Sequence, residues 1–153
     1  MNPTDFLARA NHQLTAMREL KKKHVAVGVL ANSATSRVYE GGANVLQVAA
    51  ANEFGTTRIP QRSFLKMPQE LKASELSKFI RKQMFKVLEG RQVEQGLGLI
   101  GTFAVNLSQD AFASGGFGNW PDIADETKEN KGSSAPLIDQ GTLKNSVTYE
   151  VRT

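Results

Sequence analysis

The sequence contains no cysteine, which excludes disulfide bonds and thiolate metal sites. Histidine is scarce as well, and His12 and His24 lack the spacing of a metal-binding pair. No apolar run reaches the roughly eighteen residues of a membrane span, and the opening MNPTDFLARANHQLTAM lacks a basic segment followed by an apolar core. We therefore expect no metal site, no membrane contact, no signal peptide, and folding in a reducing cytosol.

Catalytic motifs are also missing. The chain has neither a Gly-x-Ser-x-Gly elbow nor a phosphate-binding loop with Gly-Lys-Ser/Thr. The stretch GLGLIG at 96–101 formally matches a dinucleotide fingerprint, but the preceding KVLEGRQVEQ indicates a charged helix where the fingerprint needs a buried strand. We interpret these glycines as small residues where two helices approach closely. The sequence predicts neither an enzyme nor a cofactor.

The charge is divided unevenly along the chain. Residues 1–91 carry 15 Lys and Arg against 7 Asp and Glu, a balance of +8, whereas residues 92–153 carry 4 against 8, a balance of −4. The basic part could bind nucleic acid, or the two parts could attract each other between copies of the chain in a ring.

Apolar spacing predicts four helices and two strands. Thr4 is a candidate cap for the first helix, and the strand at 25–29 is expected to be central in its sheet. The predicted helices cover residues 4–20, from about 44 to Gly55, 71–88 and 93–112, and the second strand covers 147–151.

We expect an α+β fold with a small antiparallel sheet packed against several helices, joined by long ordered loops. At 153 residues and 40% hydrophobic composition, the chain is one domain's worth of protein, 1–153. It would comprise an N-terminal helix at 1–22, an extended arm at 55–66 and a long loop at 113–136.

The arm lies in the stretch AANEFGTTRIPQRSFL, residues 50–65. Gly55 stands where a helix would end on a left-handed residue, and Ile59-Pro60 imposes extended backbone on the residue before proline. The arm should therefore cross the surface and end at Phe64-Leu65. We expect Phe54 and Phe64 in the core, whereas for Arg62 and Trp120 core and interface roles stay open.

This stretch resembles the signature of the virion morphogenesis proteins of tailed phages, also called tail completion or neck proteins, from Mu-like and related phages. A second block agrees in order and spacing, so that the resemblance spans roughly residues 40–152. One departure is Ser63, where the family usually has proline. The second block comprises Trp120-Pro121, Thr127, Lys131, Leu137-Ile138-Asp139, Gly141, Leu143 and Ser146.

The resemblance implies a structural virion protein that caps the head-proximal end of the tail and joins it to the head connector. It also implies a ring of six copies, with the tail tube or tail terminator and the head connector proteins as partners, assembled in the host cytoplasm. Residues implied in subunit or partner contacts are Arg58, Ile59, Pro60, Arg62, Phe64, Trp120 and Pro121. Signature residues implied to be structural are Asn52, Glu53, Phe54, Gly55, Thr56, Asp139, Gly141, Leu143 and Ser146.

Alternatives stay open at this stage. The basic first ninety residues would suit an accessory protein that binds nucleic acid without sequence preference. Within the phage interpretation, the chain could be a tail terminator, or an assembly factor absent from the finished particle. For Glu53, a simple charge at a helix end is the alternative to a structural role.

Overall fold

The structure, a computed structural model, describes residues 2–30, 42–121 and 141–153. Within these residues, six helices and a two-stranded antiparallel sheet form a single small α+β domain, as the sequence predicts. The elements are α1 (Pro3–Leu20), β1 (His24–Val29), α2 (Val45–Phe54), α3 (Lys66–Leu71), α4 (Ala73–Leu88), α5 (Val93–Ala113), α7 (Thr142–Ser146) and β2 (Val147–Arg152).

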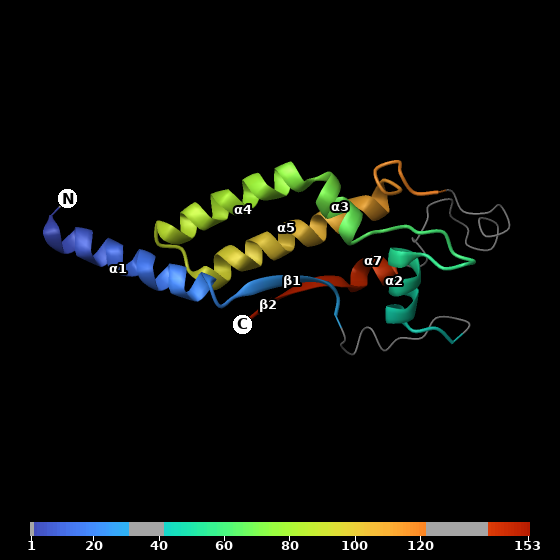
Figure 1. The fold of residues 1–153 in the computed structure, drawn as a ribbon, viewed down its shortest axis with the longest axis horizontal. Helices are drawn as coiled ribbons and strands as arrows, with labels where there is room; N and C mark the ends of the chain where they lie inside the picture. Colours follow the sequence, from blue (N-terminus) through green and yellow to red (C-terminus); the bar gives the residue numbers. More distant parts are fainter. Residues whose placement is uncertain (1, 31–41, 122–140) are drawn as a thin grey trace.

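The long helix α5 lies between the sheet and α4 (Figure 1). β1 and β2 pair antiparallel in a register that runs from His24 opposite Arg152 to Val29 opposite Val147. Among the described residues β1 pairs with β2 alone, so its expected central position is not observed there. The short helix α7, which the sequence analysis missed, begins after Gly141 and leads directly into β2.

The observed helix boundaries agree with the predicted ones only in part. Asn2, not Thr4, caps α1, because its side chain accepts the Asp5 N–H at 2.8 Å. The predicted helix at 71–88 corresponds to α4, whereas the short helix α3 before it was not predicted. Lys72, whose backbone (φ −101°, ψ 20°) leaves the helical range, separates the two helices. α2 starts as predicted, at Asn44, within a capping box.

Among the described residues, the core consists of two apolar clusters at different places along α5. One joins α2, the arm, α5 and α7; the other joins α1, α4 and α5. Phe64 is 0% exposed in the first, as predicted, but Phe54 is 77% exposed, so its predicted core position is wrong. At about 100° per residue, Phe54 lies half a turn away from Val45, which faces the core.

The glycines of α5 do permit close approach, although not only between helices. A β-carbon added at Gly96 would lie 2.5 Å from Val87 of α4, which confirms the predicted helix–helix approach there. At Gly101 it would lie 2.3 Å from the Tyr149 ring of β2, so the partner at that position is a strand. α5 can therefore pack tightly on both neighbouring layers.

Candidate functional site

The arm leaves α2 through Gly55 and closes a turn at its tip. Gly55 has the positive φ expected of it, 74°, but its ψ of 166° is extended instead of left-handed helical. The Thr56 hydroxyl accepts the N–H groups of Arg58 and Ile59 at 3.2 and 2.9 Å, and the Thr56 N–H donates to the Ile59 carbonyl at 2.8 Å. The tip, which includes Pro60, is exposed and stabilised by its own hydrogen bonds.

A buried carboxylate holds the far end of the arm. Glu53 is 6% exposed, and its Oε1 accepts the Ser63 hydroxyl at 2.8 Å and the Lys66 N–H at 3.0 Å. Its Oε2 accepts the N–H groups of Phe64 and Leu65 at 2.8 and 2.9 Å. These three amides lie at the start of α3, where helix geometry leaves N–H groups unpaired and favours a negative charge.

Glu53 is therefore much more than a charge at the end of α2. It joins the last turn of one helix to the first turn of another, across a segment with no regular structure. The signature includes Glu53 among its structural residues, but the sequence alone does not identify the partners of this carboxylate. The available signal for the contact between Glu53 and the arm is their spacing: Glu53 stands ten residues before Ser63, near the predicted end of the extended segment.

Further hydrogen bonds fix the returning half of the arm against α2. The Gln61 side chain donates to the Glu53 carbonyl at 2.9 Å, and the Arg62 N–H donates to the Asn52 carbonyl at 2.8 Å. Asn52 is buried, and its side chain donates to the Val48 carbonyl at 2.9 Å. The arm is thus a hairpin-like excursion with a braced base.

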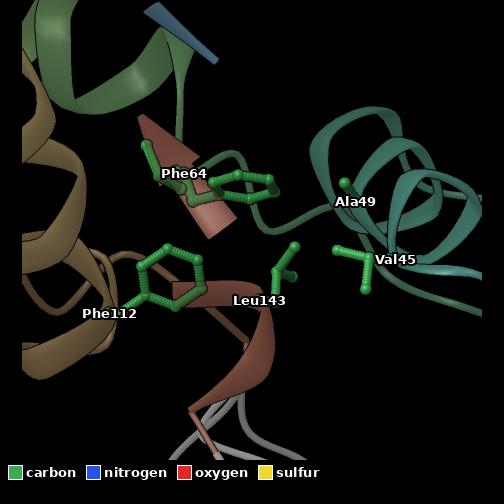
Figure 2. Packing of buried hydrophobic residues seen from close by; sticks show 6 residues of the cluster. Val45, Ala49, Phe64, Phe112 and Leu143 are labelled. Carbon is green, nitrogen blue, oxygen red and sulfur yellow. The ribbon is translucent and has the colours of Figure 1, made fainter. Parts of the chain in front are cut away.

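The second signature block packs against this base. The Trp120 indole N–H donates to the Ser63 carbonyl at 3.1 Å, and Arg62 Nε donates to the Pro121 carbonyl at 3.0 Å. The Phe112 ring lies 5.1 Å from Phe64 and 5.7 Å from Trp120, between ring centroids. Figure 2 shows the facing rings of Phe64 and Phe112 with Leu143, Val45 and Ala49 beside them.

The residues expected in subunit or partner contacts are partly buried within the chain and partly exposed. Phe64 and Arg62 are buried within the chain, which corrects the expectation that Phe64 anchors a neighbouring subunit and places Arg62 among internal contacts. Trp120 is half-buried and Pro121 is exposed. The exposed candidates are therefore the arm tip, Arg58 to Pro60, together with Phe54.

The remaining signature residues support the first core cluster or lie outside the described part. Gly141 has φ 66° at the start of α7, Leu143 is buried in the cluster, and the Ser146 hydroxyl donates to the Thr142 carbonyl at 2.7 Å. Asp139, Thr127, Lys131 and most of the loop expected at 113–136 lie outside the described residues.

A shallow hollow of about 260 Å³ lies at the base of the arm, between the arm, α3 and the turn before Pro121. Its lining is largely polar and includes Ser63, Lys66, Glu70 and Trp120. A hollow of this size at the base of the arm has room for a side chain.

Away from the arm, Lys23 forms an ion pair with Glu94 in the first turn of α5. This hydrogen bond raises the pKa of Lys23 and lowers the pKa of Glu94. Across the described ranges, no three His, Asp or Glu side chains gather as a metal site would require, and no helix there is long and apolar enough to cross a membrane.

Comparisons of the chain with protein families, with curated proteins and with solved structures give no significant match.

Proposed function

We propose that this chain is a structural virion protein of a tailed phage, a tail completion or neck component that caps the head-proximal end of the tail and joins it to the head connector as a ring of six. The observation that carries the proposal is the convergence of the two signature blocks. Arg62 and Pro121 are 59 positions apart and share a hydrogen bond, and Trp120 binds the backbone of Ser63. The residues behind the resemblance thus build one local unit.

That unit has the properties of a docking element. Its base is held by hydrogen bonds to the buried Glu53, its tip exposes Arg58 and Ile59, and the end of α2 from which it leaves exposes Phe54. A loop held in one conformation loses less entropy when it binds. The arm lies near one end of the long axis of the molecule, and the N-terminus of α1 lies at the other (Figure 1). An arm at the end of a subunit suits contact with an adjoining ring.

A head–tail joining assay tests this function. Purified protein is added to separated heads and tails made without this chain, and joined particles are counted by negative-stain electron microscopy. The wild-type chain should restore joining, whereas Arg58→Glu combined with Ile59→Asp should reduce it at least tenfold while the unfolding midpoint stays unchanged. Asn106→Glu, an exposed substitution on α5 away from the arm, is the matched control. Equal joining by tip variant and control would contradict the role of the arm.

The exposed face of α4 favours a second candidate, nonspecific binding of nucleic acid. Lys78, Arg81 and Lys82 surround Phe85 on this face, and all four side chains are exposed. Three lysine or arginine contacts to phosphates predict that the logarithm of affinity falls with the logarithm of salt concentration with a slope of about −3. Fluorescence anisotropy with random-sequence DNA at several salt concentrations measures this slope. A packed protein ring should depend much less on salt.

A further inference from the structure

Helix α1 presents an apolar face that the described residues of its own chain leave exposed. Its second half packs on the body through the buried Ala16 and through His12, whose Nε2 lies 2.9 Å from the Val87 carbonyl oxygen. Its first half extends beyond the other elements (Figure 1). Four large apolar side chains on this helix are 48–62% exposed: Phe6, Leu7, Leu14 and Met17. We call these four the α1 stripe.

The α1 stripe points away from the body. At about 100° per residue, its members fall within roughly 100° of one another around the helix. The centre of this arc is about 130° from Ala16 and about 170° from His12. Rotating α1 to cover the stripe would therefore break the contacts that now attach it. An apolar helix face of this kind marks a binding surface.

The body carries an apolar trough that suits such a helix. The trough has a volume of about 400 Å³ and is lined by apolar side chains from β1, α4 and α5, among them Leu76, Ile80 and Met84. These three α4 residues span about 12 Å at 1.5 Å per residue, and the α1 stripe spans about 16 Å. At its edge, the buried Oε1 of Gln69 has no hydrogen-bond partner among the described residues. Buried carbonyl groups normally have one.

We propose that the α1 stripe of one copy packs into the trough of the next copy, so that α1 links subunits head to tail. This inference rests on the proposed ring and names its subunit interface. Stripe and trough are different surfaces of the same chain, which is what a heterologous interface requires. The mode of contact is an amphipathic helix in an apolar groove.

The covering of both apolar surfaces favours this arrangement over pairing of two α1 helices. Taking about 200 Å² for each fully exposed side chain, the α1 stripe presents about 400 Å², half of the roughly 800 Å² that each partner gives to a stable interface. Two paired α1 helices would cover only their stripes and leave both troughs open. A copy joined head to tail covers its stripe with one neighbour and its trough with the other.

The test measures solution mass by light scattering for variants of the full chain. Leu14→Glu with Met17→Glu should reduce the assembly to monomers, while Thr15→Glu, on the polar side of α1, should leave it intact. Leu76→Glu, which lines the trough without belonging to either core cluster, should also give monomers. Mixing the two monomeric variants should yield a heterodimer, because one intact stripe then meets one intact trough.

A second measurement avoids charged substitutions and uses the lack of native cysteine. Chains with Leu14→Cys are mixed with chains carrying Leu76→Cys and treated with a short bis-maleimide. Links between the two variants should exceed links within either variant at least fivefold, and Thr15→Cys in place of Leu14→Cys should abolish this preference.

Three outcomes overturn the proposal in distinguishable ways. Rings that persist with Leu14→Glu and Met17→Glu would contradict the interface and leave the proposed function standing. Preferential linking of Leu14→Cys to itself would show that α1 helices pair. A wild-type chain that is monomeric at every concentration would overturn the interface and the ring together.

Discussion

Replacing Glu53 with glutamine should destabilise the protein strongly although the side chain keeps its volume. The carboxylate accepts four hydrogen bonds, two at each oxygen, at 2.8–3.0 Å. A glutamine has one oxygen, so it can keep at most two of these bonds, and its NH₂ group then faces the other two donors. Each buried donor left without a partner costs about 1–3 kcal/mol. We expect the free energy of unfolding to fall by about 3 kcal/mol, in the lower half of the roughly 2–6 kcal/mol range for two donors.

Urea unfolding followed by circular dichroism measures the effect. For an m-value of about 1.5–2 kcal/mol per M, a loss of about 3 kcal/mol lowers the unfolding midpoint by about 1.5–2 M. Glu89→Gln is the matched control, because it removes an exposed carboxylate whose partner is Lys86 three residues earlier. Exposed ion pairs contribute at most about 1 kcal/mol, so this variant should remain close to wild type.

Amide hydrogen exchange locates the effect within the chain. In the wild-type protein, the amides of Phe64, Leu65 and Lys66 should be protected, since all three donate to Glu53. In Glu53→Gln, one oxygen is lost, so either the Phe64 and Leu65 amides or the Lys66 amide should lose more protection than the amides in α5. Equal midpoints for Glu53→Gln and Glu89→Gln, with unchanged exchange at these amides, would refute the role assigned to the carboxylate.

Two further predictions concern α5. Gly101→Ala should lower the free energy of unfolding by about 1–3 kcal/mol, because its β-carbon would overlap the Tyr149 ring. Gly98→Ala, whose β-carbon would lie 3.3 Å from the Tyr149 hydroxyl, should be neutral or stabilising by up to about 1 kcal/mol. Thermal melts of both variants compare them. Lys23→Met should raise the pKa of Glu94, because the hydrogen bond from the lysine lowers it; NMR titration of the Glu94 carboxyl measures this, and an unchanged titration would contradict the assignment. The stability that this pair contributes is present above the unfolded-state pKa of Glu94 and is lost as pH falls through the folded-state pKa.

The sequence predicted those elements whose local signals agree with their packing. α5 and β2 were found from apolar periodicity; α5 buries one regular face against the body, and β2 pairs with β1 and packs on α5. The start of α2 near residue 44 followed from the spacing of its apolar residues, and the burial of Phe64 from its position at the end of the arm. In these places local preference and tertiary contact favour the same structure.

The sequence was a poorer guide where apolar residues do not face the chain's own core. Phe54 continued an apolar pattern in α2 but lies opposite the buried face, and the α1 residues with helical spacing are largely exposed. Periodicity identifies an apolar face without identifying what covers it. The three backbone partners of Glu53 were equally hidden, because a carboxylate that accepts from backbone amides requires no particular residue type there; Ser63 is its one side-chain partner among the described residues.

The mass of the wild-type protein in solution tests the central proposal most directly. Light scattering over a wide concentration range, with negative-stain images of the same samples, should show closed rings of about 100 kDa, the mass of six 16.7 kDa chains. Persistence of a 16.7 kDa monomer throughout that range, together with salt-sensitive binding to random DNA, would contradict the neck-ring account and support the nucleic-acid candidate.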